Sequence, residues 1–134
     1  MDNTILICVF LFFLCIYVFF SQKEHRVYGT LVDTPEDIRK GLMFRKHKLK
    51  PNEGMLFKTG WKHNSFWMKN TYIPLDMIFL SNDGTVLGFI EDAEPLTETP
   101  RQISKQSYYV LEMNGNSVSH QNIRIGDRIL FYKI

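Results

Sequence analysis

The clearest hydrophobic pattern in this chain lies between residues 66 and 80, which read FWMKNTYIPLDMIFL. Positions 75–80 are apolar in both alternating sets, and only Asp76 interrupts them. A strand that is apolar on both faces is typical of the middle of a sheet. We therefore predict a central strand at 75–80, with a short strand at 66–69 before it and a polar corner between the two.

Alternating apolar residues and turn signals predict further short strands along the chain. They cover residues 27–32, 53–58, 85–90, 108–113 and 129–132. A helix is predicted at 35–43, because Thr34 suits the N-cap and Pro35 the first helical position. A shorter helical piece is predicted at 118–121. The fold class is thus mainly β, at the margin of α+β: a small β-barrel or two packed sheets with one or two short helices.

Residues 5–20 (ILICVFLFFLCIYVFF) form an apolar run of 16 residues. As a helix the run would span about 24 Å, which is short against a hydrocarbon core of about 30 Å but within reach of a thin membrane. We predict that residues 1–22 are an N-terminal transmembrane helix, a signal-anchor, and that residues 23–134 form one compact domain. A cleaved signal peptide is the alternative, although no basic residue precedes the run and no small-residue cleavage site follows it.

Lys23 and Arg26 follow the apolar run, whereas Asp2 precedes it. The positive-inside tendency therefore predicts a single-pass membrane protein with its domain on the cytosolic side. Six cations lie between Arg39 and Lys50. They form either a solvated rim or a contact for anionic lipid headgroups.

The composition excludes an intrinsically disordered protein, because 45% of the residues are hydrophobic and 14% are aromatic. A net charge of +2 gives no reason to expect a nucleic acid as partner. Ala93 is the only alanine, a bias typical of AT-rich genomes such as those of large DNA viruses, protists or host-restricted bacteria. A structural or membrane-associated virion role would fit a viral source.

Five motifs follow one another along the chain: GLMFR at 41–45, EGMLF at 53–57, FWMKNTYIPLDMIF at 66–79, YVLE at 109–112 and IGD at 125–127. In order and spacing they resemble the domain-of-unknown-function family number 192, which occurs in bacteria and archaea, often behind an N-terminal export or anchor segment. The resemblance covers nearly everything after residue 26. It implies a compact, mostly β domain and no particular activity. It also allows export, so the side of the membrane on which the domain lies stays open.

Polar residues in or beside these motifs make up a candidate ligand site. Asp76 is its most informative member, because a carboxylate in an apolar strand must be paired or hydrogen-bonded. Arg45 or Lys69 could pair with it, and Asn70 or Thr71 could donate hydrogen bonds to it. The full candidate set is Arg45, Glu53, Trp67, Lys69, Asn70, Thr71 and Asp76.

Three interpretations of this cluster remain open. In the first, the cluster is a hydrogen-bond network that stabilises the fold. In the second, it is a ligand pocket with Trp67 as its aromatic wall. In the third, it is the active site of a small hydrolase or transferase that uses Asp76 and Glu53 as acid and base. The four histidines lack zinc-ligand spacing, and no nucleotide-binding or nucleophile motif occurs, so we expect neither a metal nor a cofactor. We expect a non-enzymatic, membrane-anchored β domain that binds a small ligand or a protein.

Overall fold

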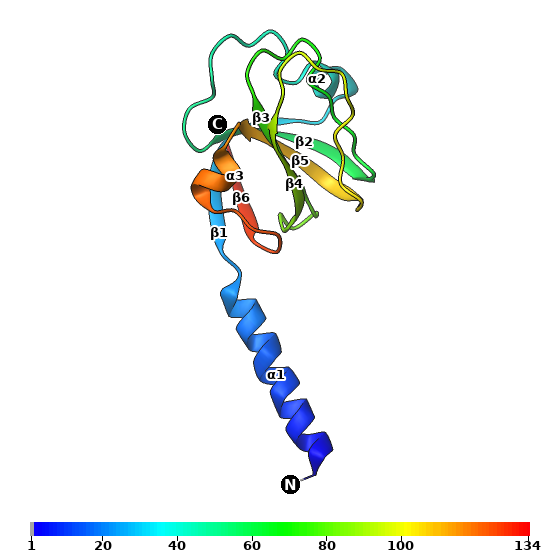
Figure 1. Cartoon of the computed structure of the whole chain (residues 1–134), viewed down its shortest axis with the longest axis vertical. Coiled ribbons are helices and arrows are strands. Elements are labelled where there is room, and N and C mark those ends of the chain that lie inside the picture. Colours follow the sequence, from blue (N-terminus) through cyan, green and yellow to red (C-terminus); the bar gives the residue numbers. More distant parts are fainter. Residues whose placement is uncertain (1) are drawn as a thin grey trace.

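The computed structural model describes residues 2–134 as an N-terminal helix followed by a domain built on one sheet (Figure 1). The helices are α1 (Asn3–Ser21), α2 (Pro35–Lys40) and α3 (Ser117–Gln121). The strands are β1 (Glu24–Val32), β2 (Glu53–Lys62), β3 (Leu75–Leu80), β4 (Val86–Ala93), β5 (Ser107–Asn114) and β6 (Arg128–Lys133).

The six strands form a single sheet in the order β4-β3-β5-β2-β1-β6. Strand β1 runs parallel to both β2 and β6, and the other neighbours are antiparallel. The two ends of the sheet meet where Thr85 pairs with Arg128 and the N–H of Val86 donates to the carbonyl of Asp127 at 2.8 Å. The predicted mainly β class is confirmed, in the form of one curled sheet rather than two packed sheets.

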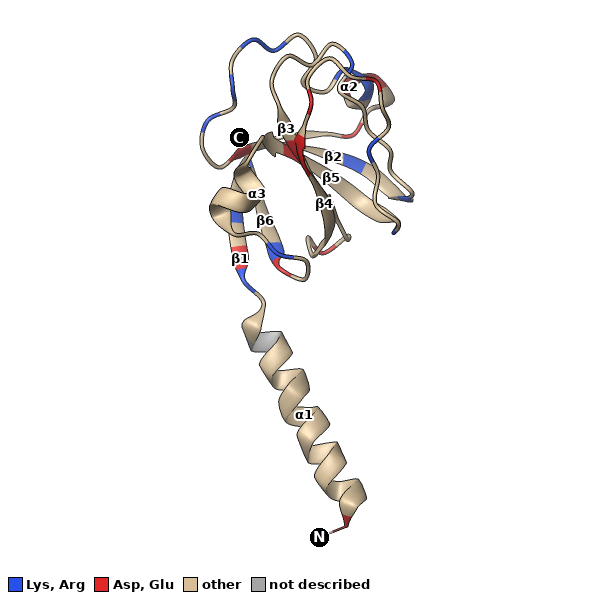
Figure 2. Ribbon diagram, in the orientation of Figure 1, with Lys and Arg blue, Asp and Glu red and all other residues tan. Residues whose placement is uncertain are grey.

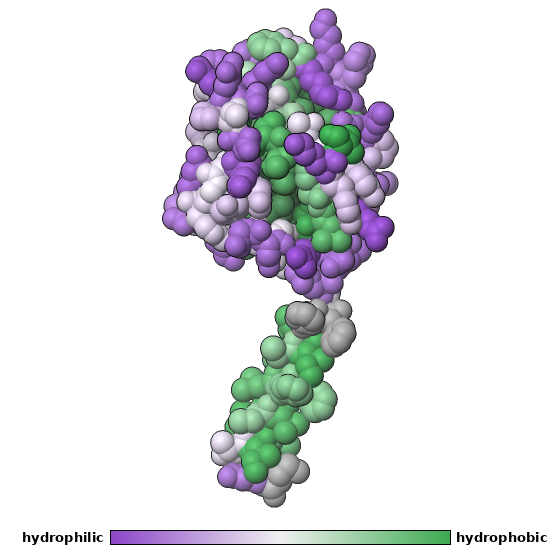
Figure 3. Space-filling model, turned by 180° about the vertical axis from the view of Figure 1, so that it is seen from behind, coloured by the Kyte–Doolittle hydropathy of each residue, from purple (hydrophilic) through white to green (hydrophobic). Residues whose placement is uncertain are grey.

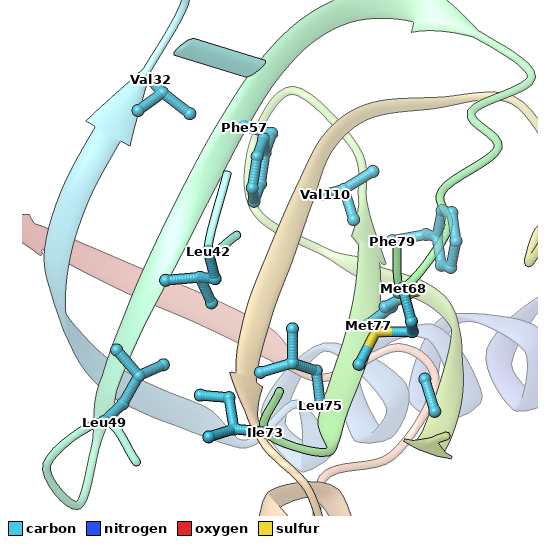
Figure 4. Close-up of a cluster of buried hydrophobic side chains, with 11 residues drawn as sticks. Val32, Leu42, Leu49, Phe57, Met68, Ile73, Leu75, Met77, Phe79 and Val110 are labelled. Atoms are coloured by element: carbon cyan, nitrogen blue, oxygen red, sulfur yellow. The ribbon is translucent and has the colours of Figure 1, made fainter. Parts of the chain in front are cut away.

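Strand β3 is buried at all six positions and lies between β4 and β5, so the predicted central strand is confirmed. Met77 and Phe79 point into one hydrophobic core (Figure 4). Ile38 of α2 and Phe66 of the connection between β2 and β3 pack against this core. Ile78 and Leu80 face the second core, which includes Val118 of α3. The apolar side chains on both faces of β3 therefore hold the two cores together.

The predicted strand at 66–69 is wrong. Only Phe66 pairs with another strand-like residue, Arg101, through backbone hydrogen bonds of 2.9 and 2.8 Å. The chain then turns, because the N–H of Thr71 bonds back to the carbonyl of Met68 and Asn70 adopts a positive φ of 51°. Residues 66–71 thus form part of the covering layer over the first core, and the full exclusion of Met68 from solvent accounts for their strand-like apolar content.

Several element boundaries also differ from the prediction: β1 starts at Glu24 instead of residue 27, and β4 ends at Ala93 instead of residue 90. Helix α2 starts as predicted, with the hydroxyl of Thr34 accepting from the N–H of Asp37 at 3.2 Å. It ends at Lys40 instead of residue 43, because Gly41 caps it with a positive φ of 47°. Strand β2 continues to Lys62, with a register irregularity after Lys58.

Helix α1 projects away from the domain (Figure 1), and most of its described residues are apolar (Figure 3). Its large apolar side chains from Ile5 to Val18 are mostly exposed to solvent, with Phe10 66% and Tyr17 71% exposed. In the part of the chain that the structure describes, no helix is both long enough and apolar enough to cross a membrane. The predicted transmembrane anchor finds no support in that observation.

Candidate functional site

A cleft of about 160 Å³ opens beside α2 on the first core. One wall consists of the last turn of α2 and the residues after it, 38–43, and the other is the segment at 65–67 together with Thr71. The ring of Phe57 on β2 lies beneath it and meets the ring of Phe66 edge to face, with 5.0 Å between the centroids. The cleft therefore has mainly apolar walls of aromatic and aliphatic side chains.

Glu112 lines this cleft, and at 4% exposure on an inner strand of the sheet it forms part of the base of the cleft. Glu112 stands two residues after Val110 on β5, so its side chain points to the same face of the sheet and into the first core. Its neighbours across the sheet are Met55 on β2 and Met77 on β3, and only 4% of the residue is exposed.

Burial among these apolar neighbours raises the pKa of Glu112 to about 8. Burial is the whole cause, because no hydrogen bond or charge from the described residues offsets it. At neutral pH the side chain is therefore a neutral carboxylic acid with one O–H to donate.

Two of the sequence-predicted residues line the cleft, Trp67 and Thr71. Trp67 is 40% exposed, and the ammonium group of Lys69 lies 5.1 Å from the centroid of its ring. Lys69 also pairs with Glu98 across 3.6 Å on the surface. The hydroxyl of Thr71 donates to the carbonyl of Lys69 at 3.0 Å, which leaves its lone pairs free to accept a hydrogen bond.

Three other predicted residues shape the loops around the cleft. The carbonyl of Asn70 accepts the N–H of Phe44 at 2.8 Å. The guanidinium of Arg45 donates to the carbonyl of His47 at 2.9 Å, and the carboxylate of Glu53 accepts the N–H of Lys50 at 2.7 Å. These contacts hold loop backbone in place, and none of the three side chains lines the cleft.

Asp76 lies on the opposite face of the sheet from Glu112 and is completely buried. Its carboxylate accepts three backbone N–H groups: those of Asp92 at 2.8 Å, Asn116 at 3.1 Å and Val118 at 2.7 Å. The expected partners Arg45, Lys69, Asn70 and Thr71 were wrong. Backbone amides satisfy this carboxylate, which ties β3 to β4 and to the start of α3.

A buried pair of polar side chains, His25 and Asp127, lies near the start of β1. Nε2 of His25 and a carboxylate oxygen of Asp127 are 2.8 Å apart, and both side chains are at most 10% exposed. Burial alone would raise the pKa of Asp127, but hydrogen bonds from His25 and from the N–H of Arg124 hold this pKa below its usual value. The pair links β1 to the turn before β6.

The sequence analysis missed Glu112, although the signal was present. A carboxylate within a predicted apolar strand is the same feature that singled out Asp76, and Glu112 stands in the YVLE motif of the strand predicted at 108–113. Sequence alone does not distinguish a carboxylate that finds donors, such as Asp76, from one that finds none.

Together these features define a small curled β domain with a mainly apolar cleft that a buried acid, Glu112, lines. The sequence profile of the family DUF192, described as "Uncharacterized ACR, COG1430", matches residues 18–131. The chain therefore belongs to this family, and the predicted resemblance is confirmed.

Two solved structures resemble the domain closely. One is a protein from Sinorhizobium meliloti 1021 described as a candidate transcription regulator; it is 38% identical, has a TM-score of 0.70, and the match covers 73% of this chain and 76% of that one. The other is a protein of unknown function from Novosphingobium aromaticivorans DSM 12444; it is 39% identical, has a TM-score of 0.71, and the match covers 75% and 71%. No protein of curated function matches the chain.

Proposed function

We propose that this chain is a non-enzymatic binding module whose cleft holds a small ligand or a side chain of a protein partner. The observation that carries this proposal is the carboxyl group of Glu112, which is 4% exposed, lacks a partner among the described residues and faces the cleft. Binding sites typically combine apolar walls with a few polar groups that fix orientation. The cleft has that composition.

Burial among apolar neighbours disfavours the ionised form of Glu112, and no hydrogen bond from the described residues compensates for it. A leucine or methionine at residue 112 would continue the packing of its neighbours Met55 and Met77. Strongly shifted titrating groups in clefts gather at functional sites. A bound group that accepts or donates a hydrogen bond would supply the partner that the protein itself does not provide.

Catalysis by Asp76 with Glu53 receives no support from the geometry. The Asp76 carboxylate is excluded from solvent and already accepts three N–H groups, so it has no access to a substrate. Neither residue lines the cleft. Asp76 and Glu53 are therefore left out of the proposed binding site, which retains Trp67 and Thr71 and adds Glu112.

Helix α1 is proposed to keep the domain at a lipid surface. The support is its exposed apolar surface: eleven large apolar side chains from Ile5 to Val18 are 43–71% exposed, and water solvates such a surface poorly. Flotation of the full chain with liposomes tests this idea. A matched variant with Leu11→Lys and Leu14→Lys, both outside the folded domain, should stay at the bottom of the gradient.

The cations between Arg39 and Lys50 lie on α2 and on the loop after it, in the half of the domain away from α1 (Figure 2). A bilayer that holds α1 would therefore not be the surface these cations meet. Arg39 and Lys40 instead belong to the wall of the cleft. We propose that these two side chains attract a ligand to the cleft and do not contact the headgroups of the membrane that holds α1.

A nucleic-acid role, which the description of the Sinorhizobium protein would imply, is not part of this proposal. The chain has a net charge of only +2, and electrostatic attraction to phosphates dominates nucleic-acid affinity. The most specific feature of its surface is an apolar cleft around a neutral acid.

Thermal-shift screening of the full chain in detergent tests the binding function. A ligand of the cleft should raise the melting temperature of the wild type, and the Trp67→Ala variant should lose that response. Trp61→Ala is the matched control, because Trp61 is also an exposed aromatic residue but packs on Tyr108 outside the cleft. Equal responses of the two variants would refute the cleft as the site.

A further inference from the structure

We infer that the cleft takes the carboxylate of a small, partly apolar organic acid, with the side chain of Glu112 as the hydrogen-bond donor at its base. This inference rests on the proposed binding function and names the chemistry of the ligand. Three independent features support it: the size of the cleft, the donor at its base and the charge at its rim.

The cleft limits the ligand to a compact molecule. A volume of about 160 Å³ is close to that of an apolar cavity of about 150 Å³ that binds one benzene molecule. Leu42, Phe57 and Phe66 offer only apolar surface to the body of such a ligand. The polar part of the ligand therefore has to be a single head group near Glu112 or at the rim.

Glu112 offers a donor rather than a negative charge at neutral pH. Its pKa of about 8 leaves the carboxyl group protonated, and no group of the described residues receives that proton in a hydrogen bond. A ligand carboxylate is the strongest common acceptor for such an O–H, because O–H···O⁻ bonds are charge-assisted. The hydroxyl of Thr71, in contrast, already donates to Lys69.

The rim carries positive charge. Arg39 and Lys40 on α2 contribute to the cleft wall, and neither forms an ion pair with a described acidic residue. Lys69, beyond Trp67, is partly neutralised by Glu98. A positive rim attracts an anion and repels an amine, so it favours the same ligand as the neutral donor at the base.

Tryptophan fluorescence offers a direct test on the full chain in detergent micelles. The Trp61→Phe background leaves Trp67, in the cleft wall, as the single tryptophan. The probes are benzoate, benzamide and benzylamine, which share a ring and differ in charge. Benzoate should bind tightest at pH 6, and its Kd should rise about tenfold by pH 9, because Glu112 loses its proton while benzoate stays ionised throughout.

Glu112→Gln should retain benzoate binding through its amide donor but lose the pH dependence. Arg39→Gln with Lys40→Gln should weaken benzoate binding severalfold, and more so at low salt. Lys46→Gln with Lys48→Gln is the matched control, because it removes the same charge from the same basic stretch outside the cleft wall and should leave the Kd nearly unchanged.

Tighter binding of benzylamine than of benzoate, or a benzoate Kd that is constant or falls with rising pH, would overturn the inference while the binding function stands. Absence of benzoate binding at pH 6 would overturn it as well. The binding function fails separately, when thermal-shift screening finds no compound or partner that depends on Trp67.

Discussion

The carboxylate of Asp76, in the middle of β3, accepts the backbone N–H of Val118 at 2.7 Å, so the central strand directly caps helix α3. Two further amides, those of Asn116 and Asp92, donate to the same carboxylate. One side chain thus ties β3 to the end of β4 and to the start of α3, which lie 16 and 42 residues further along the chain. Asn116 offers no side-chain cap to α3, which makes the carboxylate its main N-terminal acceptor.

Asp76→Asn should therefore destabilise the domain strongly. The substitution replaces one acceptor oxygen by an NH₂ group that faces backbone donors, and unsatisfied buried groups cost about 1–3 kcal/mol each. We expect a loss of about 3 kcal/mol, or about 10 °C in Tm, by thermal unfolding. Asp92→Asn is the control with the same chemical change at an exposed side chain, and it should shift Tm little. Similar losses in both variants would contradict the role of Asp76.

Glu112 makes folding depend on pH between about 4.5 and 8. Its pKa rises from 4.5 to about 8 on folding, so between these values the folded state keeps a proton that the unfolded state has lost. The contribution of Glu112 to the free energy of unfolding is therefore largest below pH 4.5. It falls as the pH rises to about 8, by at most about 1.4 kcal/mol per pH unit. Chemical denaturation of wild type and Glu112→Gln across this range should show that the variant lacks this decline.

An exposed carboxylate provides the comparison for Glu112. Glu94→Gln should follow the wild-type pH profile, because Glu94 lies at the surface. If Glu112→Gln and Glu94→Gln both keep the wild-type decline, Glu112 is ionised in the folded protein. Its proposed role as a hydrogen-bond donor in the cleft would then be refuted.

The buried pair of His25 and Asp127 predicts the opposite acid response. Hydrogen bonding holds the pKa of Asp127 below its usual 3.8, so its stabilisation is present above that value and is lost as the pH falls through the lower folded value. His25→Ala should cost about 2 kcal/mol at pH 6, because it leaves a buried carboxylate with one donor fewer. The cost should shrink toward pH 2, measured by denaturant titration.

A double-mutant cycle separates this pair from general damage. Asp127→Asn combined with His25→Ala should cost less than the sum of the two single variants. His63→Ala, at an exposed histidine, should be close to neutral. Full additivity would show that the two side chains do not interact.

The sequence correctly predicted those elements whose hydrophobic pattern is compatible with only one type of secondary structure. Strand β3 is apolar on both faces and is central, and Thr34 with Pro35 begins α2 as expected. The pattern failed at residues 66–69, because a loop that covers a core must also be apolar. Met68 is completely buried without belonging to a strand, and only tertiary contacts distinguish these two cases.

The sequence could indicate that a buried carboxylate is important, but it could not identify the residues around that carboxylate. A charge in an apolar strand marks a special residue, and this rule found Asp76 correctly. Its donors come from Asp92 and α3, far along the chain, so their identity depends on how the sheet curls. The same rule applied to Glu112 would have marked it, but its lack of donors is visible only in the folded structure.

The parallel pair β1 and β2 gives the last prediction, which concerns how closely two strands can approach. Gly29 lies opposite Gly54 in the register, and a Cβ added to Gly29 would overlap the carbonyl oxygen of Gly54. Gly29→Ala should therefore push β1 away from β2 and abolish cooperative thermal unfolding followed by circular dichroism. Gly60→Ala is the matched control: its added Cβ meets no atom within 4 Å, and only its positive φ of 73° opposes the change, at about 1 kcal/mol. If Gly29→Ala unfolds cooperatively within a few degrees of the Gly60→Ala variant, the close approach of these strands is not required for the fold.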